Sequence, residues 1–296
     1  SPIRNIESPK QVKKLIDKLQ SYSKIPLFVT IDQEGGLVNR LKEKFGFPKT
    51  ISAEKLGKIN NFDTTTKYAI SIAKTLKSIG VNLNFAPCVD LNTNPDNPII
   101  GKKERSFSSD PIIVTKHAEV FLNAFRRNKI FGTLKHFPGH GSSKDDSHLG
   151  FVDVTNTWKN IELYPYAELT KKKKCDFIMT AHIFNSNLDD KLPATLSKKI
   201  LTGILRDSLK FNGVIFSDDM QMKAIADHYG LESAVEYAIN AGVDIITFAN
   251  NVTYDENIVP KVFNIIKNLL KEGKITEERI NQSFNRIMKY KKLLSK

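Results

Sequence analysis

Six short apolar runs alternate with helical stretches along this chain, and this alternation constrains the fold more than any other feature. Each run is continuously apolar, which is typical of a strand buried on both faces. The predicted strands cover residues 26–32, 81–86, 130–135, 176–181, 213–218 and 243–248. Because a predicted helix follows each strand, the sequence indicates repeated βα units and a parallel sheet, either doubly wound or closed into a barrel.

The helical stretches carry recognisable start and stop signals. Asp63 is a candidate N-cap and Gly80 a candidate C-terminal glycine of one helix, and Pro111 stands in the first turn of the next. Pro165 predicts a break in a third stretch, and Ser197 is the expected cap of a fourth. The predicted helices cover residues 63–79, 111–127, 157–174, 197–210, 231–241, 255–272 and 276–294.

The positions of the polar residues favour a barrel over an open sheet. A dinucleotide-binding sheet would carry Gly-x-Gly-x-x-Gly after its first strand, and Gly35-Gly36 does not supply that motif. Polar residues instead end the predicted strands, where the strands of a (β/α)₈ barrel converge on one mouth. They are Asp32, Asp90, Lys135, His136, His182, Asp218, Asp219, Asn250 and Asn251. We therefore expect an α/β fold, a TIM-type (β/α)₈ barrel.

A polar loop within residues 135–148 follows the third predicted strand and gathers titratable groups. Three of the six histidines lie in this stretch, together with Asp145 and Asp146. Such crowding on a loop after a strand is typical of an active site. Lys135 and His136 leave the strand in succession, so only one should point straight inward and the other should reach the mouth from the loop.

Three side chains could perform nucleophilic or acid–base chemistry. Asp218 closes an apolar strand, where a carboxylate can act as a nucleophile or as an electrostatic stabiliser toward a sugar oxocarbenium ion. Its neighbour Asp219 is better explained as an N-cap of the following segment. Asp146 and His148 are two residues apart, and a carboxylate beside an imidazole raises its basicity and fixes its tautomer. The pair could therefore work as one acid–base unit.

The residues alone leave two other interpretations open. Asp32, Arg40 and Arg105 could form hydrogen bonds to hydroxyls or charged substituents of a ligand, or they could form salt bridges. A zinc or iron site would take its ligands from His136, His140, His148 and His182 with Asp146 or Asp218. The spacings His-x-His and His-Glu-x-x-His, which would support a metal, are absent from the sequence.

Length and charge exclude several classes of protein. A chain of 296 residues is long enough for one large barrel, and we expect residues 1–296 to form a single catalytic barrel domain. The net charge is +13, but the lysines are spread without interleaved aromatic residues, so we expect no nucleic-acid partner. Cys88 and Cys175 are too few for a disulfide scaffold and are expected to be reduced, partly buried thiols.

The sequence contains no segment that predicts a membrane span. No apolar run approaches eighteen residues, and residues 1–5 lack the apolar core of a signal peptide. We expect a cytoplasmic protein, or a secreted or lipid-anchored one if a signal segment has been removed.

Five motifs of this chain resemble, in order, the signatures of a known family. They are Ile31-Asp32-Gln33-Glu34-Gly35-Gly36, Glu104-Arg105-Ser106-Phe107, Lys135-His136-Phe137-Pro138-Gly139-His140-Gly141, Asp146-Ser147-His148 and Ser217-Asp218-Asp219-Met220. The family is that of the bacterial β-N-acetylhexosaminidases of glycoside hydrolase family three, the NagZ type. The likeness runs from about Arg4-Asn5 to the C-terminus.

The resemblance implies a TIM-type barrel and the retaining removal of terminal β-linked N-acetylglucosamine, usually from peptidoglycan fragments during cell-wall recycling. Asp218 matches the family's nucleophile, His148 its histidine general acid/base, and Asp146 the aspartate paired with that histidine. The positions that match residues holding the sugar's hydroxyls are Asp32, Arg40, Arg105, Lys135 and His136. The family uses no metal. We expect no cofactor, and a monomer whose partner is a substrate containing N-acetylglucosamine.

Two departures from the family pattern bear on these expectations. Family members usually have about two further βα units upstream of the strand at Leu27, whereas a short tail, residues 1–5, is what remains here. We therefore expect this chain to lack the first one or two βα units of the barrel. Leu37 stands where many members carry arginine, so one contact to the substrate is in doubt.

The resemblance also leaves three alternative activities. A β-glucosidase of the same family would differ in its sugar. An N-acetylglucosaminide phosphorylase would exploit the neutral histidine, because an uncharged acid/base lets an anionic acceptor such as phosphate approach. A catalytically silent barrel that binds cell-wall sugars is the third.

Overall fold

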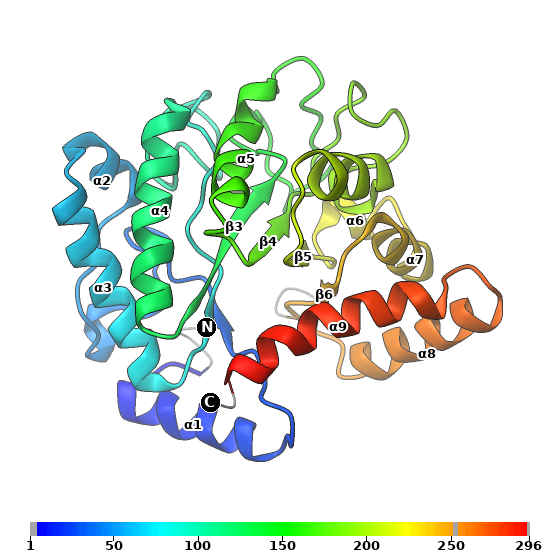
Figure 1. Ribbon diagram of the computed structural model, residues 1–296, viewed down its shortest axis with the longest axis horizontal. Helices are drawn as coiled ribbons and strands as arrows, with labels where there is room; N and C mark the ends of the chain where they lie inside the picture. Colours follow the sequence, from blue (N-terminus) through cyan, green and yellow to red (C-terminus); the bar gives the residue numbers. More distant parts are fainter. Residues whose placement is uncertain (1–4, 251–253, 295–296) are drawn as a thin grey trace.

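The computed structural model describes residues 5–250 and 254–294 and contains one curled sheet of six parallel strands (Figure 1). The strands lie side by side in chain order, each hydrogen-bonded to the next. They are β1 (Thr30–Ile31), β2 (Leu83–Asn84), β3 (Phe131–Phe137), β4 (Phe177–Thr180), β5 (Val214–Asp219) and β6 (Ile245–Thr247). The predicted parallel sheet of βα units is confirmed. Within the described residues β1 pairs only with β2 and β6 only with β5, which makes this sheet half of a barrel.

Nine α-helices surround the sheet in the described part of the chain (Figure 1). They are α1 (Pro9–Ser21), α2 (Ala53–Ile59), α3 (Phe62–Ile79), α4 (Pro111–Arg127), α5 (Tyr164–Lys171), α6 (Lys223–Ala226), α7 (Leu231–Ala241), α8 (Ile258–Lys271) and α9 (Glu277–Leu294). A π-helix, Lys199–Ser208, takes the place of a helix after β4. No helix among residues 5–250 and 254–294 is long and apolar enough to cross a membrane.

The main core lies between the sheet and the helices that cover its outer face. Successive side chains of a strand point to opposite faces, so every second strand residue belongs to this core. Leu134, Ile178 and Ile215 supply it from neighbouring strands. Ala118 and Phe125 of α4 are among the helical residues packed in the same cluster, each fully buried.

The other face of the sheet is filled by a second cluster of large apolar side chains. The buried members are Leu83, Phe85, Phe177, Met179, Val214, Phe216 and Tyr290. Tyr290 belongs to α9, and its hydroxyl donates a hydrogen bond to the Asp176 carboxylate just before β4, at 3.2 Å. The last helix therefore closes the amino end of this face, and the carboxyl end is left to the polar residues.

Several local predictions are wrong in detail. The N-cap of α3 is Asn61, whose side chain accepts the N–H of Thr64, rather than Asp63 in the first turn. Pro165 does not break a helix but stands in the first turn of α5, where its missing N–H costs nothing. Helices α1, α2 and α6 were not predicted.

Other predictions are confirmed. Helices α4 and α7 have the predicted bounds, and Gly80 ends α3 in a left-handed conformation. Ser197 accepts the N–H of Ile200 at the start of the π-helix, although the N-cap is the next residue, Lys198.

The prediction of Asp219 as an N-cap is wrong, because the N-cap of α6 is Met222; Asp219 Oδ1 instead accepts the N–H groups of Gln221 and of Ala249 after β6. Asn251, predicted at a strand end, lies outside the described residues.

Candidate active site

Lys135 and His136 lie within β3, which runs on to Phe137, and both side chains reach the carboxyl end of the sheet. The expectation that both would reach the mouth is confirmed, but the expectation that one would do so from the loop is wrong, because both belong to the strand. Lys135 Nζ lies 2.8 Å from Asp32 Oδ1 and 2.7 Å from Glu34 Oε1. Burial opposes the charged form of Lys135, but these two carboxylates outweigh it and its pKa is raised. The ammonium is thus a fixed cation beneath the mouth.

Arg105 joins this cation to His136. Its guanidinium binds both oxygens of Glu34, at 2.9 Å from Nε and 2.8 Å from Nη2, and Nη2 also lies 3.1 Å from His136 Nε2. Burial would raise the pKa of Glu34, but Arg105 and Lys135 together lower it to about 2. The carboxylate is therefore ionised over the whole range of physiological pH, and it fixes two cations at once.

Asp90 fixes the other side of the His136 ring. Its Oδ2 lies 2.7 Å from His136 Nδ1, and its Oδ1 accepts the N–H of His140 at 2.7 Å. Burial would raise the pKa of Asp90, but His136 and His140 hold it well below its usual range. Arg105 can only donate, so its contact makes Nε2 the acceptor and Nδ1 the donor to Asp90. His136 is thus held in one tautomer and one orientation.

Asp218 stands at the end of β5 and is half-buried. Its Oδ1 accepts the N–H of Asp219 at 2.8 Å. Burial opposes ionisation, but His182 and then other basic groups, Lys135 included, prevail and lower the pKa of this carboxyl. At neutral pH it is an anion that is available for nucleophilic attack.

His182, two residues after β4, supports this corner of the mouth. It is buried, and its Nε2 donates to the carbonyl oxygen of Asp219 at 3.0 Å. Its pKa is lowered, chiefly by burial and further by the nearby His148 ring. The loop histidine thus lies within electrostatic range of His182.

Asp146 and His148 form the predicted pair on the loop after β3. His148 Nδ1 lies 2.8 Å from Asp146 Oδ1, which also accepts the His148 backbone N–H at 2.8 Å. The His148 side chain is 61% exposed. Among the described residues no hydrogen bond joins His148 to Asp218 or to the Lys135 network. The loop is tied down next to this pair, where the carbonyl oxygen of Ser147 accepts the N–H of Ala224 at 3.3 Å.

The structure thus brings five predicted residues to one end of the sheet: Asp32, Arg105, Lys135, His136 and Asp218. Arg40 is exposed and lies 3.7 Å from Asp32, so it stands at the rim. Leu37, where many family members carry arginine, is exposed.

Three functional residues were not assigned from the sequence. Glu34 and Asp90 hold the cations and the imidazole in place, and His182 faces Asp218. Glu34 follows Asp32 in a motif that the resemblance quoted, and Asp90 and His182 were noted as strand-end residues. These signals located the three side chains but could not say which groups they would pair with, because Arg105 is 71 positions from Glu34 and His136 is 46 positions from Asp90.

The histidines proposed as metal ligands do not form a cluster in the described part of the chain. His140 is buried, burial lowers its pKa to about 4, and its Nδ1 lies 2.7 Å from the Ser143 hydroxyl. The group of possible ligands that does cluster is Cys88, Asp90 and His136. Burial raises the pKa of the Cys88 thiol, and Asp90 accepts hydrogen bonds from backbone and imidazole. This chemistry fits a hydrogen-bonded support better than a metal site.

Glu162 lies beneath the turn that leads into the acid–base loop. The residue is 1% exposed and neither carboxyl oxygen has a hydrogen-bond partner of good geometry, although Ser142 and the backbone of Gly141 and Lys159 lie close enough to oppose the rise of its pKa. A side chain at Gly139 would collide with it, since an added Cβ would lie 2.7 Å from Glu162 Oε2. Burial raises the pKa of Glu162 to about 7.

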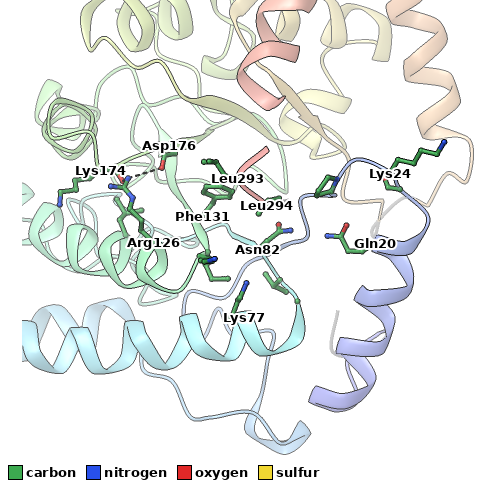
Figure 2. A pocket seen from close by; sticks show the side chains of 18 residues that line it. Gln20, Lys24, Lys77, Asn82, Arg126, Phe131, Lys174, Asp176, Leu293 and Leu294 are labelled. Atoms are coloured by element: carbon green, nitrogen blue, oxygen red, sulfur yellow. Dashed lines mark hydrogen bonds and ion pairs between the residues drawn. The ribbon is translucent and has the colours of Figure 1, made fainter. Parts of the chain in front are cut away.

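A cavity of about 720 Å³ lies at the opposite, amino end of the sheet (Figure 2). It is bordered by Asn82, Phe131 and Asp176 near the starts of three strands and by Leu293 of α9. Arg126, labelled in Figure 2, is occupied by an ion pair with Asp176 at 3.3 Å. None of the predicted site residues lines this cavity, so its size does not mark the site.

Comparison with known proteins gives one family and a consistent set of relatives. The model of the "Glycosyl hydrolase family 3 N terminal domain" matches residues 1–290. Beta-hexosaminidase A of Pseudoalteromonas piscicida is 36% identical over 97% of this chain and 52% of its own length. Beta-hexosaminidase LpqI of Mycobacterium tuberculosis is 33% identical over 89% of this chain and 67% of its own length.

Solved structures agree with this match. A glycoside hydrolase family 3 beta-N-acetylglucosaminidase from Paenibacillus sp. superimposes with a TM-score of 0.91 and 33% identity, over 98% of this chain and 55% of that one. The structure of M. tuberculosis LpqI gives a TM-score of 0.83 at 28% identity and covers 97% of this chain and 90% of its own. The chain spans about half the length of the Pseudoalteromonas relative and of the Paenibacillus structure.

Proposed function

This chain belongs to glycosyl hydrolase family 3, and from that premise we propose that it is a retaining exo-β-N-acetylglucosaminidase. Its substrates would be peptidoglycan fragments or related glycosides with terminal β-linked N-acetylglucosamine. The relatives named beta-hexosaminidase and beta-N-acetylglucosaminidase support the sugar. The observation that carries the proposal is the ionised carboxylate of Asp218 at the carboxyl end of the sheet, beside a fixed network of cations and an imidazole.

Asp218 is the proposed nucleophile. Its carboxylate attacks the anomeric carbon as the glycosidic C–O bond breaks, and His148 donates a proton to the departing oxygen. Water then attacks the glycosyl-enzyme, and His148 takes its proton as the sugar leaves with retained configuration. Asp146 at 2.8 Å orients the imidazole and stabilises its protonated form.

The Lys135 network is the proposed clamp for the sugar. We use "clamp" for Asp32, Arg40, Arg105, Lys135 and His136 with their supports Glu34 and Asp90. Asp32 is only partly buried, so one of its oxygens can accept from a sugar hydroxyl while the other binds Lys135. Most clamp groups are paired and buried before substrate arrives, so binding requires little reorganisation of the protein.

His148 differs because it must move to act. Its ring is exposed and tied to the neighbouring Asp146, and we propose that the loop closes over the bound sugar to bring His148 to the glycosidic oxygen. An imidazole is neutral or cationic and never anionic in this cycle, so it avoids the repulsion that a second carboxylate would feel from Asp218.

We also propose that the six-stranded sheet is part of an eight-stranded barrel. The strand order follows the chain and all pairs are parallel, which is how a TIM-type barrel is built. A structure of the complete natural protein would test this, since two further strands between β6 and β1 are expected and direct contact of these two strands would contradict it.

The activity is tested with a panel of chromogenic β-glycosides. We expect release of the chromophore from the β-N-acetylglucosaminide and at most weak release from the β-glucoside. The first product, observed by NMR, should be the β-anomer. A sugar phosphate formed only when phosphate is present would instead identify a phosphorylase, and binding without turnover of any glycoside would identify a silent sugar-binding barrel.

A further inference from the structure

Three rings from three different loops meet at the carboxyl end of the sheet. Phe151 lies 5.3 Å from Phe184 and 5.5 Å from His228, measured between ring centroids. Phe151 follows β3, Phe184 follows β4, and His228 follows α6, which itself follows β5. Because β3, β4 and β5 are neighbours in the sheet, these loops share one side of the mouth. We call the three residues the aromatic platform.

The platform is joined to the loop that carries the proposed acid/base. Phe151 comes three residues after His148. The backbone on either side of Phe184 is paired with the same loop, since Phe184 N–H donates to Val152 at 2.8 Å and Val154 N–H donates to Phe184 at 2.9 Å. The platform therefore keeps a defined place beside His148.

The platform is open to solvent. Phe151 is 44% exposed, and Leu149, between it and His148, is 75% exposed. Rings that served only to pack the loop would be covered, because burial is what makes apolar contact favourable. An exposed apolar surface beside a polar site is typical of a surface that a ligand covers.

The position of the platform fits one part of the substrate. The departing oxygen must lie within hydrogen-bonding reach of the general acid, so the leaving group extends from His148 away from Asp218. A pyranose has an apolar face of C–H groups, which are attracted to the negative face of an aromatic ring. A sugar that leaves past His148 thus meets the rings.

We propose that Phe151, Phe184 and His228 form a leaving-group subsite that stacks against the pyranose ring on the reducing side of the scissile bond. The proposal rests on the proposed function and adds the substrate class to it: the enzyme prefers a sugar over a small aglycone. The terminal N-acetylglucosamine binds in the clamp, and the next sugar covers the platform.

Two substrates that differ only in the leaving group test the proposal. The β-1,4-linked disaccharide of N-acetylglucosamine has a sugar to place on the platform, whereas β-N-acetylglucosaminyl fluoride has none. For Phe151→Ala we expect kcat/KM to fall about fivefold to tenfold on the disaccharide and less than about twofold on the fluoride. Phe151→Tyr, which keeps the ring, should restore the disaccharide rate.

The controls separate this proposal from others. Phe263→Ala, at an exposed phenylalanine of α8, should change neither rate. Equal losses on both substrates would mean that Phe151 only stabilises the loop. No loss on either substrate would mean that the ring does not contact the leaving group. Either result would contradict the proposed subsite. If the wild-type protein cleaves neither substrate, the proposed function itself fails.

Discussion

The clamp and the acid–base loop lie at the same end of the sheet but are built differently. In the clamp, Lys135 is 1% exposed and binds two carboxylates, and Arg105 binds the second of them with two nitrogens. In the loop, His148 is 61% exposed and its side chain binds Asp146, two residues earlier. The clamp side chains are fixed by contacts distant in sequence, whereas the His148 side chain is held by a local contact.

The difference corresponds to two tasks. Recognition of hydroxyls is favoured by groups that are already in place, because ordering them during binding would cost free energy. Proton transfer to a glycosidic oxygen needs a group that can approach after the sugar has entered. Changes in the clamp should therefore affect stability and activity together, whereas changes in the loop should affect activity alone.

The largest expected effect is the loss of activity when the proposed nucleophile is removed. Asp218→Ala removes the proposed nucleophile, and we expect kcat/KM to fall by about 10⁴ or more while the fold is retained. The chromogenic β-N-acetylglucosaminide provides the measurement. Asp227→Ala, at an exposed aspartate after α6, is the matched control and should keep full activity. A variant of Asp218 with more than a tenth of the wild-type rate would exclude the assigned role.

Glu34→Gln should break the clamp. It removes the carboxylate that binds Arg105 and Lys135, and buried cations without their partner are costly, so the free energy of unfolding should fall by about 3 kcal/mol. Urea denaturation measures this value. Glu272→Gln, which removes a half-exposed ion pair with Lys274, should cost less than about 1 kcal/mol. Similar losses in both variants would contradict the fixed clamp.

His148→Ala should have the opposite profile. We expect the rate on a substrate with a poor leaving group to fall about 10²-fold to 10⁴-fold, with little change for a leaving group that departs unprotonated. The unfolding free energy should stay within about 0.5 kcal/mol of wild type, because the ring is exposed. The dependence of the rate on leaving-group pKa is measured with a series of aryl glycosides, for wild type and the variant. A uniform loss across the series would argue against general acid catalysis.

A pH-dependent effect on stability is expected at Glu162, beneath the turn that leads into the acid–base loop. The pKa of Glu162 is raised from 4.5 to about 7, so the folded state binds the proton more tightly than the unfolded state. Its contribution to the free energy of unfolding is fully present below pH 4.5 and is lost as the pH rises through 7. The whole change amounts to about 3 kcal/mol. Glu162→Gln should lose this part of the pH dependence and be more stable than wild type at pH 8.

Thermal or urea unfolding of wild type and Glu162→Gln between pH 5 and 8 gives the measurement. Asp90 and Tyr166 interact with Glu162 electrostatically, so the difference between the two proteins, rather than either curve alone, reports the carboxyl. Parallel curves would show that Glu162 is ionised throughout this range.

The sequence predicted most of the fold because local signals agreed with it. Helix α4 has an N-cap, a first-turn proline and apolar periodicity, and its bounds were predicted correctly. Helix α1 was missed because its buried face consists of Val12 and Ile16 among several lysines. The cap of α3 was placed at Asp63 rather than Asn61, since two suitable residues stand next to the same helix start.

The site could be predicted in its residues but not in its connections. Strand ends located Asp32, Lys135, His136 and Asp218, and the spacing of Asp146 and His148 predicted their pairing. The pairing of Glu34 with Arg105 joins residues 71 positions apart, and only the folded chain brings them together. The exposure of His148, on which the proposed loop movement depends, also has no sequence signal.

The proposed retaining mechanism through Asp218 is tested most directly by trapping the covalent intermediate. A 5-fluoro β-N-acetylglucosaminyl fluoride forms the glycosyl-enzyme quickly and releases it slowly, so peptide mass spectrometry can identify the modified residue. We predict an adduct on the peptide that contains Asp218, and none in Asp218→Ala. An adduct on another carboxylate, or turnover that leaves no adduct and gives the α-anomer first, would contradict the account.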